Sequence, residues 1–150
     1  MKEHRLNNED ALEFIFAGNS TSTFRNSETE NRFTFKVKQK KGSNIFFVSV
    51  LTSPGNYTYI GTVISKNFLH SRKSTISKDS QCVRVFEYVL NKLKLKKLPS
   101  VLEIWHEGKC GKCNRKLTVP SSLTTGLGPD CFKKLNKEAK RNKNLELILE

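Results

Sequence analysis

Three cysteines in the last third of the chain constrain what it can fold into more than any other feature. Cys110 and Cys113 form a Cys-x2-Cys turn around Gly111, and Cys131 follows a glycine-rich turn later in the sequence. Two thiols at this spacing reach one metal ion, and a third cysteine with a histidine completes a tetrahedral set that suits zinc. His106, shortly before Cys110, is the expected fourth ligand. The pattern predicts a closed, structural Zn2+ site made of His106, Cys110, Cys113 and Cys131.

The residues around Cys131 predict a helix that begins just before it. Pro129 suits the first position of a helix, so Cys131 is expected in the first turn. There the helix dipole favours the thiolate form that binds metal. A Cys-x2-Cys turn followed by a cysteine at a helix N-terminus indicates a treble-clef-like zinc module.

Other interpretations of these residues stay open. His106 is then a surface residue that follows Trp105, and the Cys-x2-Cys turn is a reduced pair without metal. If His106 does not bind, the fourth position is open to water, which is the arrangement of a zinc hydrolase. A disulfide is disfavoured, because the N-terminus does not resemble a signal peptide for an oxidising compartment.

The segment CGKCNRKLTVPSS at residues 110–122, with GLGPDC at 126–131, resembles a known family. Its members are small proteins encoded mainly by bacteriophages, prophages and plasmids, and they end in a cysteine domain of the form CGxCxRxLTxPxS…GxGPxC. A looser similarity extends upstream through 17–20, 31–35 and 57–62. The resemblance implies a metal-binding phage accessory protein and supplies no established activity. Asn114 stands where the family often has glycine.

Chain length allows a core domain with a small metal-stabilised appendage, since there are 150 residues. We expect an α+β domain with an antiparallel meander and helix over 1–100, and a zinc-binding module with a basic C-terminal helix over 101–150. The expected fold is an antiparallel β-sheet of three to five strands packed with one long helix, plus the treble-clef-like module. Trp105 is expected to pack the module against the main domain.

The period of the apolar residues places the expected elements. Alternation and β-forming residues predict strands over 21–25, 32–38, 45–51, 57–64 and 101–105. Spacings of three and four predict a short helix over 11–17 and a long one that ends near Lys96. Cys82 belongs to the buried stripe of the long helix, so we keep it out of the metal site.

A formal net charge of +13 indicates an anionic partner. Nucleic acid or a nucleoprotein is the first expectation, and an acidic protein is the alternative. The segment 66–74, with Lys36, Lys38, Tyr57 and Tyr59, offers cations beside rings on which bases stack, although Phe68 and the tyrosines also occur as ordinary core or sheet-face residues. The candidate nucleic-acid-binding residues are Lys36, Lys38, Arg72, Lys73, Lys109, Lys112, Arg115, Lys116, Lys133 and Lys134.

The sequence lacks the motifs of several enzyme classes. There is no glycine-rich phosphate loop with lysine and serine or threonine, no carboxylate cluster for magnesium and no deaminase pattern. We therefore expect a protein that is not an enzyme, with a zinc hydrolase as a minor alternative. The competing function is inhibition of a host defence system, of anti-CRISPR or anti-restriction type, by binding a host protein target. No run of apolar residues is long enough for a membrane, so the expected location is the cytoplasm of a bacterial host, and the oligomeric state stays open.

Overall fold

The computed structural model describes residues 4–118 and 120–134, and these contain an antiparallel sheet of seven strands. The strands are β1 (Arg5–Leu6), β2 (Asn19–Asn26), β3 (Arg32–Gln39), β4 (Ile45–Ser53), β5 (Asn56–Ile64), β6 (Asn67–His70) and β7 (Leu102–His106). Their order across the sheet is β1-β7-β2-β3-β4-β5-β6. The last strand in sequence therefore lies between the first two.

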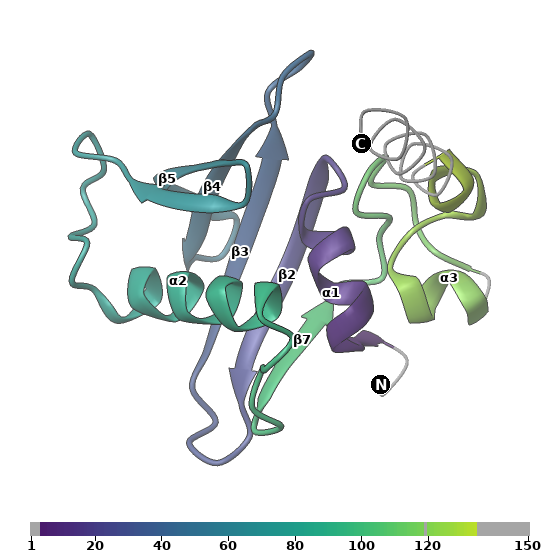
Figure 1. Cartoon of the computed structure of the whole chain (residues 1–150), viewed down its shortest axis with the longest axis horizontal. Helices are drawn as coiled ribbons and strands as arrows, with labels where there is room; N and C mark the ends of the chain where they lie inside the picture. Colours follow the sequence, from purple (N-terminus) through teal and green to yellow (C-terminus); the bar gives the residue numbers. More distant parts are fainter. Residues whose placement is uncertain (1–3, 119, 135–150) are drawn as a thin grey trace, which may run out of the picture.

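Two helices cover one face of this sheet (Figure 1). They are α1 (Asn8–Ile15) and α2 (Gln81–Lys94). Phe86 of α2 is 1 % exposed and packs against Phe24, Phe35 and Phe68 of the strands. The short helix α3 (Pro120–Thr125) and the helical residues 129–134 lie beside α1, away from α2 (Figure 1).

Strand β3 shows how the sequence divides the sheet into a covered and an open face. Phe35 and Val37 are 0 % exposed, whereas Lys36 and Lys38 between and after them are exposed. Successive side chains of a strand point to opposite faces, so the apolar set meets the helices and the lysines stand on the other side. Among the described residues, α1 and α2 lie on the same face, which leaves the reverse face without a helix.

The α+β class is confirmed, but the expected sheet of three to five strands and single long helix is wrong in two respects. The sheet has seven strands, because β1 and β6 were not expected as regular strands. Strand β1 contains only two residues, too few for any period, and β7 supplies the partner that makes it a strand. Strand β6 pairs with β5 where Gly61 stands, and a Cβ there would lie 2.3 Å from the Leu69 carbonyl oxygen. The second respect is the helical layer, which α1 and the 14-residue α2 form together.

Strand β7 joins the two segments that the sequence separated. It belongs to the residues assigned to the zinc module, yet it pairs with β1 on one side and β2 on the other. Trp105 in β7 pairs with Arg5 and Thr23, and its indole Nε1 donates to Glu103 at 3.2 Å. Because Thr23 lies opposite Thr34 in the register with β3, Trp105 stands on the open face, where it does not serve as the expected bridge to the module.

Candidate metal centre

The first two cysteines lie in a tight turn that directly follows β7. The Cys110 N–H donates to the Arg115 carbonyl at 2.8 Å, and the Asn114 N–H donates to the Cys110 carbonyl at 2.9 Å. Asn114 takes the left-handed conformation with φ of 63°, which asparagine tolerates better than most residues. These bonds fold Cys113 back toward Cys110, as the Cys-x2-Cys spacing predicted.

The third cysteine lies in the first turn of the helical residues 129–134. Gly126, with φ of 76°, turns the chain after α3, and the Phe132 N–H then donates to the Gly128 carbonyl at 2.9 Å. Pro129 occupies the first helical position, where the absence of an N–H costs nothing. The helix start expected for Cys131 is confirmed.

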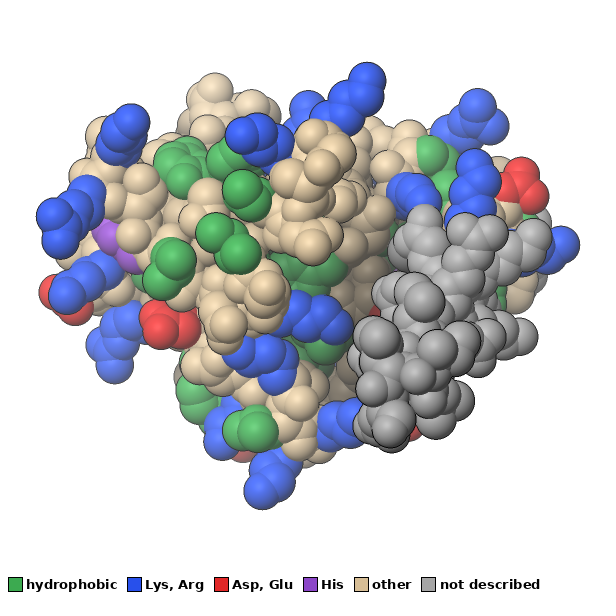
Figure 2. Space-filling view, turned by 45° about the horizontal axis from the view of Figure 1, so that its top comes forward, with side chains coloured by type: hydrophobic (Ala, Val, Ile, Leu, Met, Phe, Trp, Pro, Cys, Tyr) green, Lys and Arg blue, Asp and Glu red, His purple; other side chains and the backbone are tan. Residues whose placement is uncertain are grey.

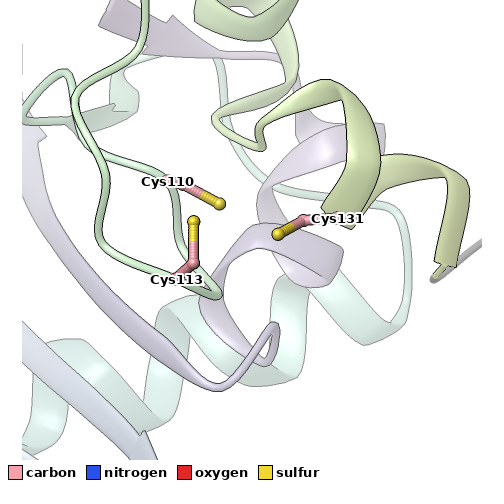
Figure 3. A group of neighbouring side chains, drawn as sticks. All are labelled: Cys110, Cys113 and Cys131. Carbon is pink, nitrogen blue, oxygen red and sulfur yellow. The ribbon is translucent and has the colours of Figure 1, made fainter.

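The sulfur atoms of Cys110, Cys113 and Cys131 all lie within 4.8 Å of one another. Cys110 and Cys113 point toward each other from the turn, and Cys131 points toward them from the facing helix (Figure 3). Three sulfurs bound to one zinc ion at about 2.3 Å lie about 3.8 Å apart in a tetrahedron. A contraction of about 1 Å or less therefore converts this group into three sides of a zinc site.

The surroundings of the sulfurs favour a thiolate at Cys110. Burial raises its pKa, but N–H groups of Cys113, Gly128 and Lys112 point at the sulfur and bring the pKa down to about 7. The Lys112 and Gly128 N–H groups donate to the Cys110 sulfur, with nitrogen-to-sulfur distances of 3.4 and 3.3 Å. For Cys131, burial and then the neighbouring sulfurs of Cys110 and Cys113 raise the pKa. Negative charge thus accumulates first on Cys110. A divalent cation would remove the repulsion that keeps the Cys131 proton bound.

His106, the expected fourth ligand, is not part of the sulfur group that the structure brings together. Its Nδ1 accepts the Gly108 N–H at 2.9 Å, so the proton is on Nε2, which donates to the Leu123 carbonyl at 2.6 Å. The ring is 3 % exposed and stacks on His4 with 4.9 Å between centroids. Both nitrogens are therefore engaged in linking β7 to the segment around α3. The sequence indicated the imidazole as a candidate ligand but gave no sign that it would hydrogen-bond to the Leu123 carbonyl.

A cavity of about 340 Å³ opens beside the sulfur atoms. The three cysteines line it together with Arg115, Lys116 and Lys134, and Asp130 is the acidic residue of the described lining. Asp130 was not among the residues expected at the site, although its place directly before Cys131 could have drawn attention to it. The site is therefore a group of thiols in a recess whose charged lining residues are mostly cationic.

Phe14 of α1 holds the metal motif against the main sheet and was missed by the sequence analysis. Its ring is 0 % exposed, and Cβ atoms added to Gly111 and Gly126 would lie 2.7 and 2.5 Å from it. The Gly111 N–H donates to the Gly126 carbonyl at 2.9 Å, and the Gly111 carbonyl accepts the Asn19 N–H at 2.7 Å. The two glycines allow the cysteine turn, the α3 turn and α1 to meet at one point.

The expected nucleic-acid-binding cations fall into three separate places. Lys36 and Lys38 stand on the open face of the sheet, and Arg72 and Lys73 are exposed in the loop after β6. The others belong to the module: Lys109, Lys112, Arg115, Lys116, Lys133 and Lys134. Figure 2 shows Lys and Arg side chains spread around the visible face with few acidic ones among them.

These features define an α+β protein with a half-covered antiparallel sheet and a three-cysteine candidate metal centre. Residues 104–136 match DUF6011, a family of unknown function. The match begins within β7 and includes all three clustered cysteines, and it leaves the other strands outside. No curated protein and no solved structure matches the chain. In the part of the chain that the structure describes, no helix is long and apolar enough to cross a membrane.

Proposed function

We propose that this protein is a phage-type accessory protein that binds nucleic acid, or a complex containing it, and that a structural zinc ion holds its C-terminal module. The observation that carries the proposal is the cationic lining of the sulfur recess. Arg115, Lys116 and Lys134 line the cavity that the three cysteines line, against one acidic residue in the described lining, Asp130. Cations gathered on one small module give a phosphate backbone several contacts at once.

Zinc is the proposed metal because of the donor atoms. Three thiol sulfurs within 4.8 Å are soft ligands, and a Cys-x2-Cys turn facing a cysteine in a first helical turn is a treble-clef-like arrangement. A structural role is supported by Cys110, which is 1 % exposed and belongs to the same buried core as Leu117 and Leu127. Cys113 is exposed and forms the outer side of the site.

The phage origin in this proposal is supported by the sequence resemblance of residues 110–131. The binding of nucleic acid is supported by the excess of positive charge, +13 over the whole chain. Charge of this kind gives attraction that weakens with salt and does not depend on sequence. We therefore expect binding to many nucleic acids at low salt, without strong sequence preference.

The test is a fluorescence anisotropy titration of labelled nucleic acid with the zinc-loaded full chain, at about 50 and about 200 mM salt. The Arg115→Gln/Lys116→Gln variant removes two charges from the recess. The matched control, Lys78→Gln/Lys97→Gln, removes two charges from exposed positions before and after α2.

We expect the recess variant to reduce the slope of log affinity against log salt by about 2, because each lost phosphate contact reduces the slope by roughly 0.9 on duplex DNA. The control should keep most of the slope. Absence of binding by the unmodified protein even at about 50 mM salt would refute the proposed function.

A further inference from the structure

The open face of the sheet carries an unusual share of the exposed apolar side chains. Phe47, Leu51, Ile64 and Leu69 are 39, 36, 42 and 59 % exposed. The strand register places all four on the same face as Lys36 and Lys38, since Lys38 pairs with Phe47 and Thr62 pairs with both Phe47 and Leu69. This face is therefore both apolar and cationic, which is different from the merely polar reverse of a half-buried sheet.

Lysines of β3 lie beside aromatic rings of β4 and β5 on this face. Tyr59 pairs with Ser49 and Tyr57 with Leu51, so both tyrosines point to this face. The Phe47 and Tyr59 rings are 6.2 Å apart between centroids in an edge-on contact. The Lys36 ammonium reaches across Ser49 of β4 and stands 4.9 Å from the centroid of Tyr57. Neighbouring strands thus supply flat rings and positive charges within one small area.

We propose that this face binds single-stranded nucleic acid, with bases stacked on Tyr57, Tyr59 and Phe47 and phosphates neutralised by Lys36 and Lys38. The inference rests on the proposed function, and it names the form of the nucleic acid and a second surface for it. RNA and DNA share this chemistry, because both present a base with two flat faces beside an anionic backbone.

A duplex does not fit this face equally well. Its bases are stacked on one another, so ring faces on a sheet meet only the backbone, whereas an unpaired base can lie on a tyrosine. Among the described residues, the acidic side chains near the face include Glu30, Glu103 and Glu107. Glu30 lies 3.9 Å from the Arg25 guanidinium. Glu103 is paired with Arg25 at 2.8 Å and with Arg5 at 3.4 Å, so little of its charge opposes a phosphate. Burial and then the charge of Glu107 raise the pKa of Tyr57, which keeps its hydroxyl neutral.

The test compares labelled single strands of oligo(dT) and oligo(rU), about 20 nucleotides long, with a duplex of equal length, using the zinc-loaded full chain. The variants are Tyr57→Ala and Tyr59→Ala, and Tyr59→Phe keeps the ring. The chain offers a matched control in Tyr88 of α2, which is 46 % exposed and has the Lys92 ammonium 5.6 Å from its centroid. Tyr88→Ala therefore removes an equivalent ring and cation pair from the other side of the molecule.

We expect each of Tyr57→Ala and Tyr59→Ala to weaken single-strand binding roughly tenfold, with Tyr59→Phe and Tyr88→Ala close to the unmodified protein. Lys36→Gln should reduce the salt slope on single strands by about 0.7, the value for one phosphate. The ratio between the oligo(dT) and oligo(rU) affinities identifies whether the face prefers DNA or RNA.

Two results would overturn the inference while leaving the proposed function intact. One is a duplex that binds as tightly as the single strands and is weakened only by the Arg115→Gln/Lys116→Gln variant. The other is an equal loss from Tyr88→Ala and Tyr59→Ala. If no probe binds at low salt, the proposed function itself fails.

Discussion

The contact between Phe14 and Gly126 gives the sharpest prediction about how the metal motif is attached. Gly126 has φ of 76°, and a Cβ there would lie 2.5 Å from Cδ2 of Phe14. Two effects therefore destabilise the Gly126→Ala variant, namely the left-handed backbone conformation and the clash with Phe14. Left-handed conformation costs a residue with a Cβ about 1–2 kcal/mol. Overpacking of a buried site costs about 1–3 kcal/mol more, and Phe14 is 0 % exposed, so its ring has little room to move.

Gly55 provides a control with nearly the same backbone. Its φ is 75°, and nothing lies within 4 Å of an added Cβ. Gly55→Ala should therefore lose only the backbone part, about 1–2 kcal/mol. The difference between the two alanine variants isolates the clash with Phe14. In a Phe14→Ala background, which removes every ring atom near the added Cβ, Gly126→Ala should cost about as much as Gly55→Ala, with a coupling energy of about 1 kcal/mol or more.

The measurement is urea unfolding followed by circular dichroism, with zinc held at one fixed excess so that metal binding contributes equally to every variant. Zinc content after gel filtration serves as a second readout, because Gly126 is bonded to Gly111 inside the cysteine turn. If Gly126→Ala and Gly55→Ala lower the free energy of unfolding equally, then Phe14 does not pack against the turn and the account of the attachment is wrong.

Three further predictions concern the sulfur group and an ion pair. Cys131→Ser should lower the zinc content of the purified protein and Cys82→Ser should leave it unchanged in a colorimetric release assay, because Cys82 lies outside the sulfur group. In competition with a chelator at several pH values, zinc affinity should fall in acid, and more steeply below the Cys110 pKa of about 7 than above it, because zinc then displaces the Cys110 proton as well. Burial raises the Glu103 pKa, but the Arg25 hydrogen bond and nearby charges bring it below its ordinary value of 4.5. The ionised carboxylate therefore stabilises the folded protein above pH 4.5. This stabilisation is lost as the pH falls through the lower pKa of the folded state. Glu103→Gln should therefore destabilise most at neutral pH and least in acid, and a pH-independent loss would contradict the ion pair.

The sequence was most informative where structure depends on neighbouring residues. The expected strand over 32–38 is observed as Arg32–Gln39, because alternation of Phe33, Phe35 and Val37 with polar residues fixes both the strand and its covered face. The Cys-x2-Cys turn and the helix start before Cys131 were predicted for the same reason. Both depend on short spacings, because only two residues separate Cys110 from Cys113 and Pro129 stands two positions before Cys131.

Features that depend on distant partners were not predictable in this way. The sequence shows His106 four positions before Cys110, but the carbonyl that accepts its hydrogen bond belongs to Leu123. Phe14 belongs to a short amphipathic helix, and nothing in the local sequence indicates that its ring packs against Gly111 and Gly126. Each of these contacts joins segments that the fold, and not the local sequence, brings together.

The same contacts explain why the metal motif and the sheet form one structure. Strand β7 ends at His106, whose ring nitrogens bond to Gly108 before the cysteine turn and to Leu123 of α3. The turn itself returns to the sheet, because the Gly111 carbonyl accepts the first N–H of β2 at 2.7 Å. A metal ion that fixes the three sulfurs therefore also fixes the end of β7 and the start of β2, two strands that pair directly. Metal binding, if it occurs as proposed, would thus be coupled to the conformation of the sheet at β7 and β2. Strands β5 and β6 lie at the opposite edge and share none of these contacts in the part of the chain that the structure describes.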